Sequence, residues 1–133
     1  METNQFIIEK VSPLDFEKTV ELLTLEAEKR NWIIPAIHDL QQSLAKSGKA
    51  VRPVKVLELC KPEYSGKMLE KNDERIVSVM MPCRISVYIK EDGRTYIASI
   101  NASGMISGMP EMVREVMTAA SDEVNDIVNL VIG

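Results

Sequence analysis

The segment 84–101 constrains the fold more than any other part of this sequence. Two stretches in which apolar and polar residues alternate flank the dipeptide Asp92-Gly93. An Asp-Gly pair in this setting is a strong indication of two antiparallel strands joined by a two-residue turn. The turn predicts a register with Val87 opposite Ala98, and it places Cys83 on the same, apolar face of the hairpin. The opposite face should be polar and in contact with water or a partner.

Shorter apolar segments bounded by turn residues predict further strands at 6–10, 32–37, 53–60 and 76–81. Apolar residues at helical spacing, together with capping residues, predict helices that begin at Ser12, Asp39, Glu63 and Pro110. The last helix has the most regular apolar stripe, formed by Val113, Val116, Met117, Ala120, Val124, Ile127 and Val131. This order of elements predicts an α+β fold in which helices cover one face of an antiparallel sheet.

Two leucines in the short helix after Asp39 carry a separate expectation. Leu40 and Leu44 are four residues apart and therefore share one side of that helix. We expect both to face inward, and Gly48 to end the helix.

The two cysteines, Cys60 and Cys83, are the main chemical feature of the chain. If the strand 53–60 pairs antiparallel with the strand that begins at Cys83, its end meets that strand's start. The segments 60–62, 81–83 and 101–105 would then gather at one edge of the sheet. Alternation along 53–60 places Cys60 opposite to the leucines of its strand, so the pattern leaves open whether both thiols share a face.

Length and composition are those of a globular protein. The chain has 133 residues, of which 45% are hydrophobic and 27% charged, and we expect one domain spanning residues 1–133. No apolar run approaches the ~20 residues of a membrane span, and no basic segment followed by an apolar core opens the chain. We therefore expect a cytoplasmic protein without a membrane partner, whose cysteines are kept reduced.

Charge also excludes a class of partner. The formal net charge is −4, and the lysines and arginines are scattered along the chain. Binding to nucleic acid relies on a basic face that neutralises phosphates. We therefore expect no nucleic-acid partner.

Three stretches together resemble the domain of unknown function 302 family. They are Leu-Cys-Lys-Pro at 59–62, Met-Met-Pro-Cys-Arg-Ile-Ser-Val-Tyr at 80–88, and Asp-Gly-Arg-Thr-Tyr-Ile-Ala-Ser-Ile-Asn at 92–101. The resemblance implies a compact α+β domain with TATA-binding-protein-like topology, a homodimer, and no assigned activity. In many relatives Gly-Asn-Pro stands where this chain has Cys60-Lys61-Pro62, so the chain is similar to a cysteine-bearing branch of the family.

A homodimer also agrees with one surface feature of the predicted hairpin. Tyr88 and Ile97 leave an apolar spot on its otherwise polar face. Such a spot indicates a contact surface, and a two-fold axis would bring two copies of it together.

The residue types around the cysteines indicate a candidate site. Lys61 follows Cys60, and a nearby ammonium stabilises the thiolate that acts as nucleophile or metal ligand. Met81 and Met105 lie in the converging segments and add thioether sulfur, so the ligand set suits a soft metal such as Cu(I). The alternative is that both cysteines and most methionines simply pack in the core.

Other chemistry is weakly represented. The chain has a single histidine, His38, so a closed zinc site would need carboxylates or a second subunit. His38 beside Asp39 forms a possible acid–base pair, although a loop histidine near a helix cap is more often solvated. The sequence contains no Cys-x-x-Cys motif, phosphate-binding glycine loop, nucleophile elbow or zinc-protease motif. It identifies no cofactor.

Three function classes remain open. The first is a homodimeric binding module that holds a soft metal or a sulfur-linked small ligand at Cys60 and Cys83. The second is a structural or protein-interaction dimer with packing cysteines. The third is a thiol redox or sulfur-transfer enzyme, ranked last because no base, oxyanion donor or cofactor motif accompanies the thiols.

Overall fold

The computed structural model describes residues 6–102 and 105–133. The strands are β1 (Ile7–Ser12), β2 (Ile37–Asp39), β3 (Val54–Leu59), β4 (Cys83–Ile89) and β5 (Thr95–Ile100). The helices are α1 (Phe16–Lys29), α2 (Leu40–Ala45), α3 (Pro62–Leu69), the 3-10 helix η1 (Asp73–Met80) and α4 (Glu111–Ile132). The strands form one antiparallel sheet in the order β1-β5-β4-β3-β2. The predicted α+β class and antiparallel sheet are confirmed.

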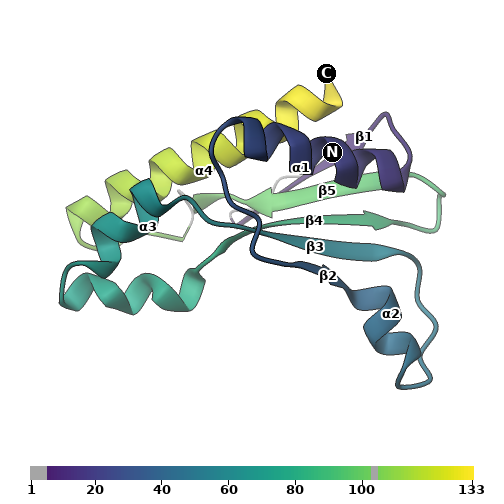
Figure 1. Cartoon of the computed structure of the whole chain (residues 1–133), viewed down its shortest axis with the longest axis horizontal. Helices are drawn as coiled ribbons and strands as arrows, with labels where there is room; N and C mark the ends of the chain where they lie inside the picture. The colour runs from purple at the N-terminus through teal and green to yellow at the C-terminus, as the bar shows by residue number, and fades with distance from the viewer. Residues whose placement is uncertain (1–5, 103–104) are drawn as a thin grey trace.

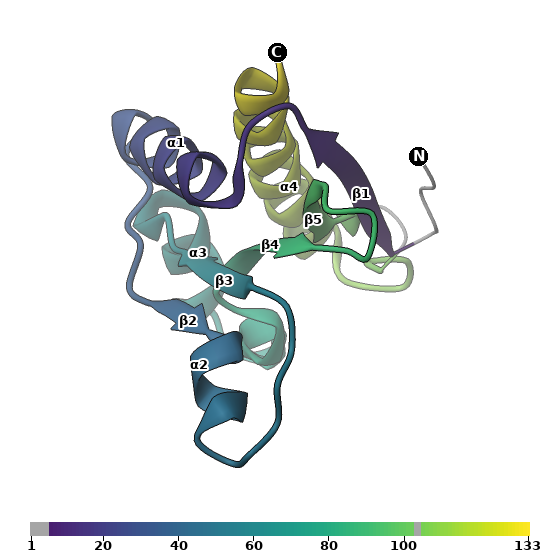
Figure 2. The same ribbon diagram turned by 90° about the vertical axis from the view of Figure 1, so that its right-hand side faces the viewer.

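Two long helices cover one face of the sheet. Figure 1 and Figure 2 show α1 and α4 next to each other on this face, while α2 projects from the sheet edge on the other side. The main core lies between the helices and the sheet. Its strand side chains are Leu57, Leu59, Ile85, Val87 and Ile97, and its helix side chains are Phe16, Val20, Leu23, Ala27, Ala120, Val124, Ile127, Val128 and Val131. Burial of these apolar side chains is the main term that stabilises the fold.

The hairpin between β4 and β5 has a different register from the one predicted. Val87 lies opposite Ile97, not Ala98, because the loop holds the three residues 91–93. The Gly93 N–H donates to the carbonyl of Lys90 at 3.0 Å, and Gly93 adopts φ +79°. A tight turn followed by a left-handed glycine is the usual form of a three-residue hairpin loop, and it shifts the pairing by one residue.

This shift changes which residues reach each face of the sheet. Ile97 is only 1% exposed and packs under the helices, so the predicted surface spot formed by Tyr88 and Ile97 is wrong. Tyr96 instead lies beside Tyr88 on the face without α1 and α4, with ring centroids 6.1 Å apart and planes within 10°. We call this the open face of the sheet.

Two predicted strands are absent or shorter. Residues 73–80 form η1 rather than the predicted strand 76–81, with Val77 buried and Ile76 and Val79 72% and 85% exposed. The β-branched residues favour a strand, but β3 and β4 pair with each other and leave no edge between them. Of the predicted strand 32–37, only Ile37 belongs to β2, because Pro35 cannot donate to a ladder.

Helix starts agree only in part with the sequence. Asp39 caps α2 as predicted and accepts a hydrogen bond from the Gln42 N–H at 2.9 Å. The cap of α1 is Asp15, which accepts from the Lys18 N–H at 2.8 Å, whereas Ser12 ends β1. Asp15 is the better cap because its carboxylate reaches the free amides of the first turn.

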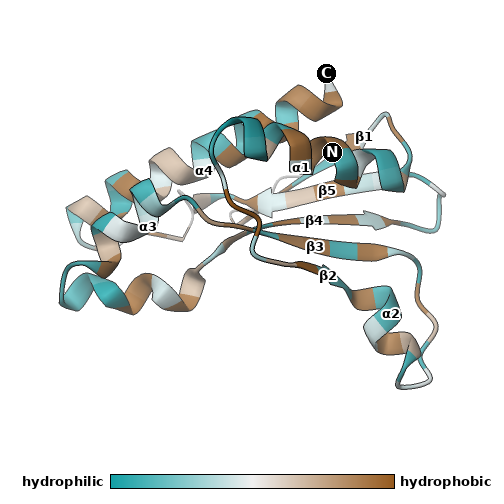
Figure 3. Ribbon diagram, in the orientation of Figure 1, coloured by the Kyte–Doolittle hydropathy of each residue, from teal (hydrophilic) through white to brown (hydrophobic). Residues whose placement is uncertain are grey.

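The expected inward orientation of Leu40 and Leu44 is wrong. Both side chains are exposed, and α2 has no buried residue. Figure 3 shows brown and teal bands together on α2, which projects away from the rest of the chain. The apolar side of this short helix is therefore only partly covered by its own chain.

Among the described residues, no helix has both the length and the apolar content that crossing a bilayer requires.

The hairpin geometry makes a testable prediction. Gly93→Ala should lower the free energy of unfolding by about 1 kcal/mol, because a side chain is strained in the left-handed conformation. Gly66→Ala is the matched control, since its added Cβ would meet only the Glu70 Oε1 at 3.8 Å and alanine favours a helix. Urea unfolding of both variants gives the comparison. Equal losses in the two variants would contradict the proposed role of Gly93.

Candidate functional site

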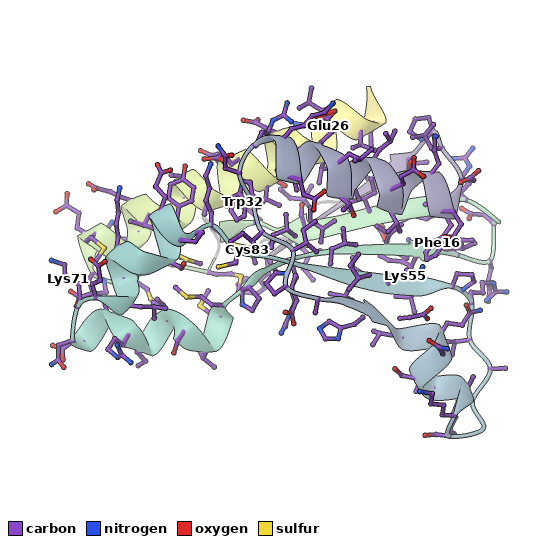
Figure 4. The ribbon with its side chains drawn as sticks, viewed as in Figure 1. Phe16, Glu26, Trp32, Lys55, Lys71 and Cys83 are labelled. Atoms are coloured by element: carbon purple, nitrogen blue, oxygen red, sulfur yellow. The ribbon has the colours of Figure 1, made fainter. Side chains whose placement is uncertain are left out.

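A cavity of about 340 Å³ lies at the end of the sheet where β3 finishes and β4 begins. Its wall includes the six sulfur-bearing residues Cys60, Met68, Met80, Met81, Cys83 and Met117. The other lining residues are Trp32, Pro35, Glu58, Leu59, Lys61, Tyr64, Ser65, Leu69, Pro82 and Ala120. Figure 4 shows yellow sulfur atoms near the labelled Cys83, at the end of the sheet where α3 and η1 lie. We call this space the sulfur cavity.

The pairing of β3 with β4 places the two cysteines. Leu59 lies opposite Cys83, and Cys83 shares the helix-covered face with Ile85. Cys60 comes one residue after Leu59 and no longer pairs with β4. It forms two backbone hydrogen bonds of 2.8 Å with Ile33 instead. The chain therefore leaves β4 at Cys60. Cys60 and Cys83 are both half-buried, and both line the sulfur cavity.

The thiols are free and make no bond to each other. The Cys60 Sγ lies 3.8 Å from the Ser65 Oγ, on α3. Burial raises the pKa of the Cys83 thiol above its ordinary value, and electrostatic repulsion by Cys60 adds to this rise in pKa. Cys83 is therefore protonated at neutral pH, and a protonated thiol is a weak nucleophile.

Lys61 points to a carboxylate rather than to a thiol. Its ammonium lies 2.7 Å from the Glu123 Oε1, and its side chain is only 13% exposed. The same ammonium lies 5.7 Å and 5.5 Å from the ring centroids of Trp32 and Tyr64. Its charge is thus balanced within this cluster, so the expected stabilisation of a Cys60 thiolate by Lys61 has no support in the geometry.

Glu123 is the centre of this cluster. It accepts hydrogen bonds from the Lys61 ammonium, the Tyr64 hydroxyl and the Trp32 indole N–H, the last at 3.0 Å. Burial acts to raise the pKa of the Glu123 carboxyl, but these hydrogen bonds outweigh that effect and hold the pKa below its usual value. The hydrogen bond to Glu123, with burial, raises the pKa of Tyr64 to about 12. The cluster ties α3 and the segment at Trp32 to α4.

The other expected site residues are separated. Met81 lines the sulfur cavity, but Met105 lines a neighbouring cavity of about 180 Å³. Residues 103–104 of the expected third segment lie outside the described residues. His38 is not among the lining residues; its Nε2 lies 2.7 Å from the Glu58 carboxylate, while Asp39 caps α2. Within residues 6–102 and 105–133, no group of three or more His, Cys, Asp and Glu side chains could hold a metal.

Sequence reasoning missed Glu123, Trp32 and Tyr64. Glu123 lies 62 residues from Lys61 along the chain, so no local spacing links them. One indication was present: Glu123 is a carboxylate next to the apolar stripe of α4, between Ala120 and Val124. A charged residue at the border of a buried stripe usually has a specific partner.

The Glu123 cluster predicts a pH-dependent stability. Because its pKa is lowered by folding, Glu123 contributes stability above its usual pKa and loses that contribution as the pH falls through the lowered value. Glu123→Gln should lose about 1–3 kcal/mol at about pH 6.5 and less at about pH 3.5. Urea unfolding followed by the fluorescence of Trp32 measures both values. Glu115→Gln, an exposed change on the same helix, should cost under about 0.5 kcal/mol at either pH.

A loss from Glu123→Gln that stays the same at both pH values would contradict this account. It would mean that the carboxylate contributes through shape and not through its charge.

Comparison with known proteins agrees with the resemblance in the sequence. A model of the family described as domain of unknown function DUF302 matches residues 8–131. An uncharacterized protein of Aquifex aeolicus (strain VF5) is 24% identical over 129 residues, which cover 94% of this chain and 83% of that protein. The crystal structure of an uncharacterized conserved DUF302 protein from Bacillus stearothermophilus has a TM-score of 0.86 at 18% identity, over 96% of this chain and 99% of that one. That likeness shows a shared fold, and the family match over residues 8–131 shows that this chain belongs to the DUF302 family.

Proposed function

We propose that this chain is a binding module whose sulfur cavity receives a small apolar ligand, in contact with the thiols of Cys60 and Cys83. The observation that carries the proposal is that both cysteines line one cavity of about 340 Å³ with a mainly apolar wall. This volume lies at the lower end of the range found for small-molecule sites, and such sites are mostly apolar. Methionine side chains add a polarizable surface that adapts to ligand shape.

Binding is better supported than thiol catalysis. The raised pKa of Cys83 opposes a thiolate at neutral pH. Lys61 is held by Glu123, and the pKa of Tyr64 lies near 12, so neither group is placed to accept a proton from a thiol. Two free thiols fit a reducing compartment, and we place the module in the cytoplasm.

A pair of variants on α4 tests this function. Ala120 lines the sulfur cavity, whereas its neighbour Ala119 does not. Ala120→Leu should weaken binding of trifluoromethylbenzene, followed by fluorine NMR, by about tenfold or more, because the added carbons occupy the ligand space. Ala119→Leu should leave the affinity within about twofold. Urea unfolding confirms that both variants fold, and equal binding by both would exclude this cavity as the site.

The sulfur atoms support a soft metal as a second candidate ligand. Two thiols and four thioethers line the cavity, and this donor set suits Cu(I). Cys60→Ser and Cys83→Ser should each weaken Cu(I) binding by about tenfold or more in an anaerobic competition with a coloured chelator. Met112→Leu is the control, since Met112 does not line the cavity. Retention of Cu(I) by both serine variants would rule out a metal held by the thiols.

We propose in addition that two copies associate through the open face of the sheet. This face carries the exposed Ile7 and Ile100 and the half-buried Tyr88, and neither α1 nor α4 covers it. A two-fold axis would bury these side chains against their copies. The surface differs from the one expected from sequence, because Ile97 is buried under the helices and the exposed apolar residues of this face are Ile7 and Ile100.

Light scattering at micromolar concentration tests the dimer. Ile100→Asp should shift the wild-type dimer to a monomer, because a carboxylate would be buried without a partner at the interface. Leu130→Asp is the control, since Leu130 is 53% exposed on α4. A wild-type chain that is monomeric at this concentration would refute the dimer.

A further inference from the structure

The sulfur cavity adjoins a second apolar space. The neighbouring cavity of about 180 Å³, which we call the side cavity, shares Met80, Pro82, Cys83 and Met117 with it. These four side chains form the wall between the two spaces. Two of them are methionines, whose unbranched side chains change rotamer easily and fill or vacate irregular space. The cavities are therefore adjoining apolar spaces that meet at Cys83, and a rotamer change of the two methionines would join them into one elongated region.

The two ends of this region differ in charge. At the sulfur cavity, the Lys61 ammonium is neutralised by Glu123 at 2.7 Å. At the side cavity, Arg84 lines the wall, is exposed, and makes no side-chain hydrogen bond or salt bridge among the described residues. Glu58 lies opposite Arg84 in the register but lies 2.7 Å from the His38 ring. A guanidinium at the mouth of an apolar space can therefore bind an anion from solvent.

We propose that the ligand of this site is an unbranched alkyl chain with a single anionic head group, a carboxylate or a phosphate. This inference rests on the proposed function and names its ligand class. The head group pairs with Arg84, and the chain runs through the side cavity, past Cys83, into the sulfur cavity. The apolar chain supplies affinity through burial, and the head group sets the direction in which the ligand enters.

The length of the alkyl chain gives the first test, with the whole 133-residue protein chain. Dodecanoate, below its micelle concentration, should bind about 100-fold or more tighter than hexanoate in calorimetry, since each buried methylene adds roughly fourfold. Trp32 lines the sulfur cavity but not the side cavity and is the only tryptophan of the chain. Dodecanoate should therefore change its fluorescence, whereas hexanoate should not. Ala120→Leu should weaken dodecanoate and leave hexanoate unchanged.

The charge of the head group gives the second test. Arg84→Gln should weaken dodecanoate by about tenfold or more, and Arg94→Gln, at the hairpin turn away from both cavities, should leave it within about twofold. Dodecanol should bind more weakly than dodecanoate. Dodecyl phosphate identifies the head group: tighter binding than dodecanoate assigns a phosphate, and weaker binding assigns a carboxylate.

Three results would overturn the inference. Equal binding of dodecanol and dodecanoate, with no effect of Arg84→Gln, would rule out an anionic head group as part of the ligand. If dodecanoate does not bind while trifluoromethylbenzene still binds, an elongated alkyl ligand is ruled out. The proposed function, binding of a small apolar ligand in the sulfur cavity, would then still stand. If neither molecule binds, both proposals fall.

Discussion

The pairing of β3 with β4 is the interaction on which the rest of the structure depends. It aligns Leu57 with Ile85 and Leu59 with Cys83. The core side chains beneath α1 and α4 therefore lie on the same face of the sheet as Cys83, which borders both cavities. Because side chains alternate strictly along a strand, a slip of one residue would move all of them to the open face. Core packing and the site are therefore fixed by the same register, and neither can change alone.

Sequence patterns predicted the elements whose requirements are local. The apolar stripe of α4, the Asp39 cap and the extent of β3 need only spacing within one segment, and the structure has all of them. The meeting of the segments that carry Cys60 and Cys83 also follows from antiparallel pairing alone. Both residues line the sulfur cavity, although alternation along the strand did not show how Cys60 reaches it.

The remaining features depend on contacts between distant segments. Asp92-Gly93 is compatible with a loop of two or three residues, and burial of Ile97 decides between them. Residues 73–80 favour a strand by composition but find no free edge. The cluster around Glu123 joins side chains from three segments, and only the packing of α3 on α4 brings these together.

The projecting helix α2 has a consequence for how sequences with this fold can diverge. It has six residues, an Asp39 cap and no buried side chain, so the main core does not depend on its length or composition. Substitutions or insertions between β2 and β3 would leave the registers of the other strands intact. Changes in this arm would therefore alter the outer surface of the molecule without altering its interior.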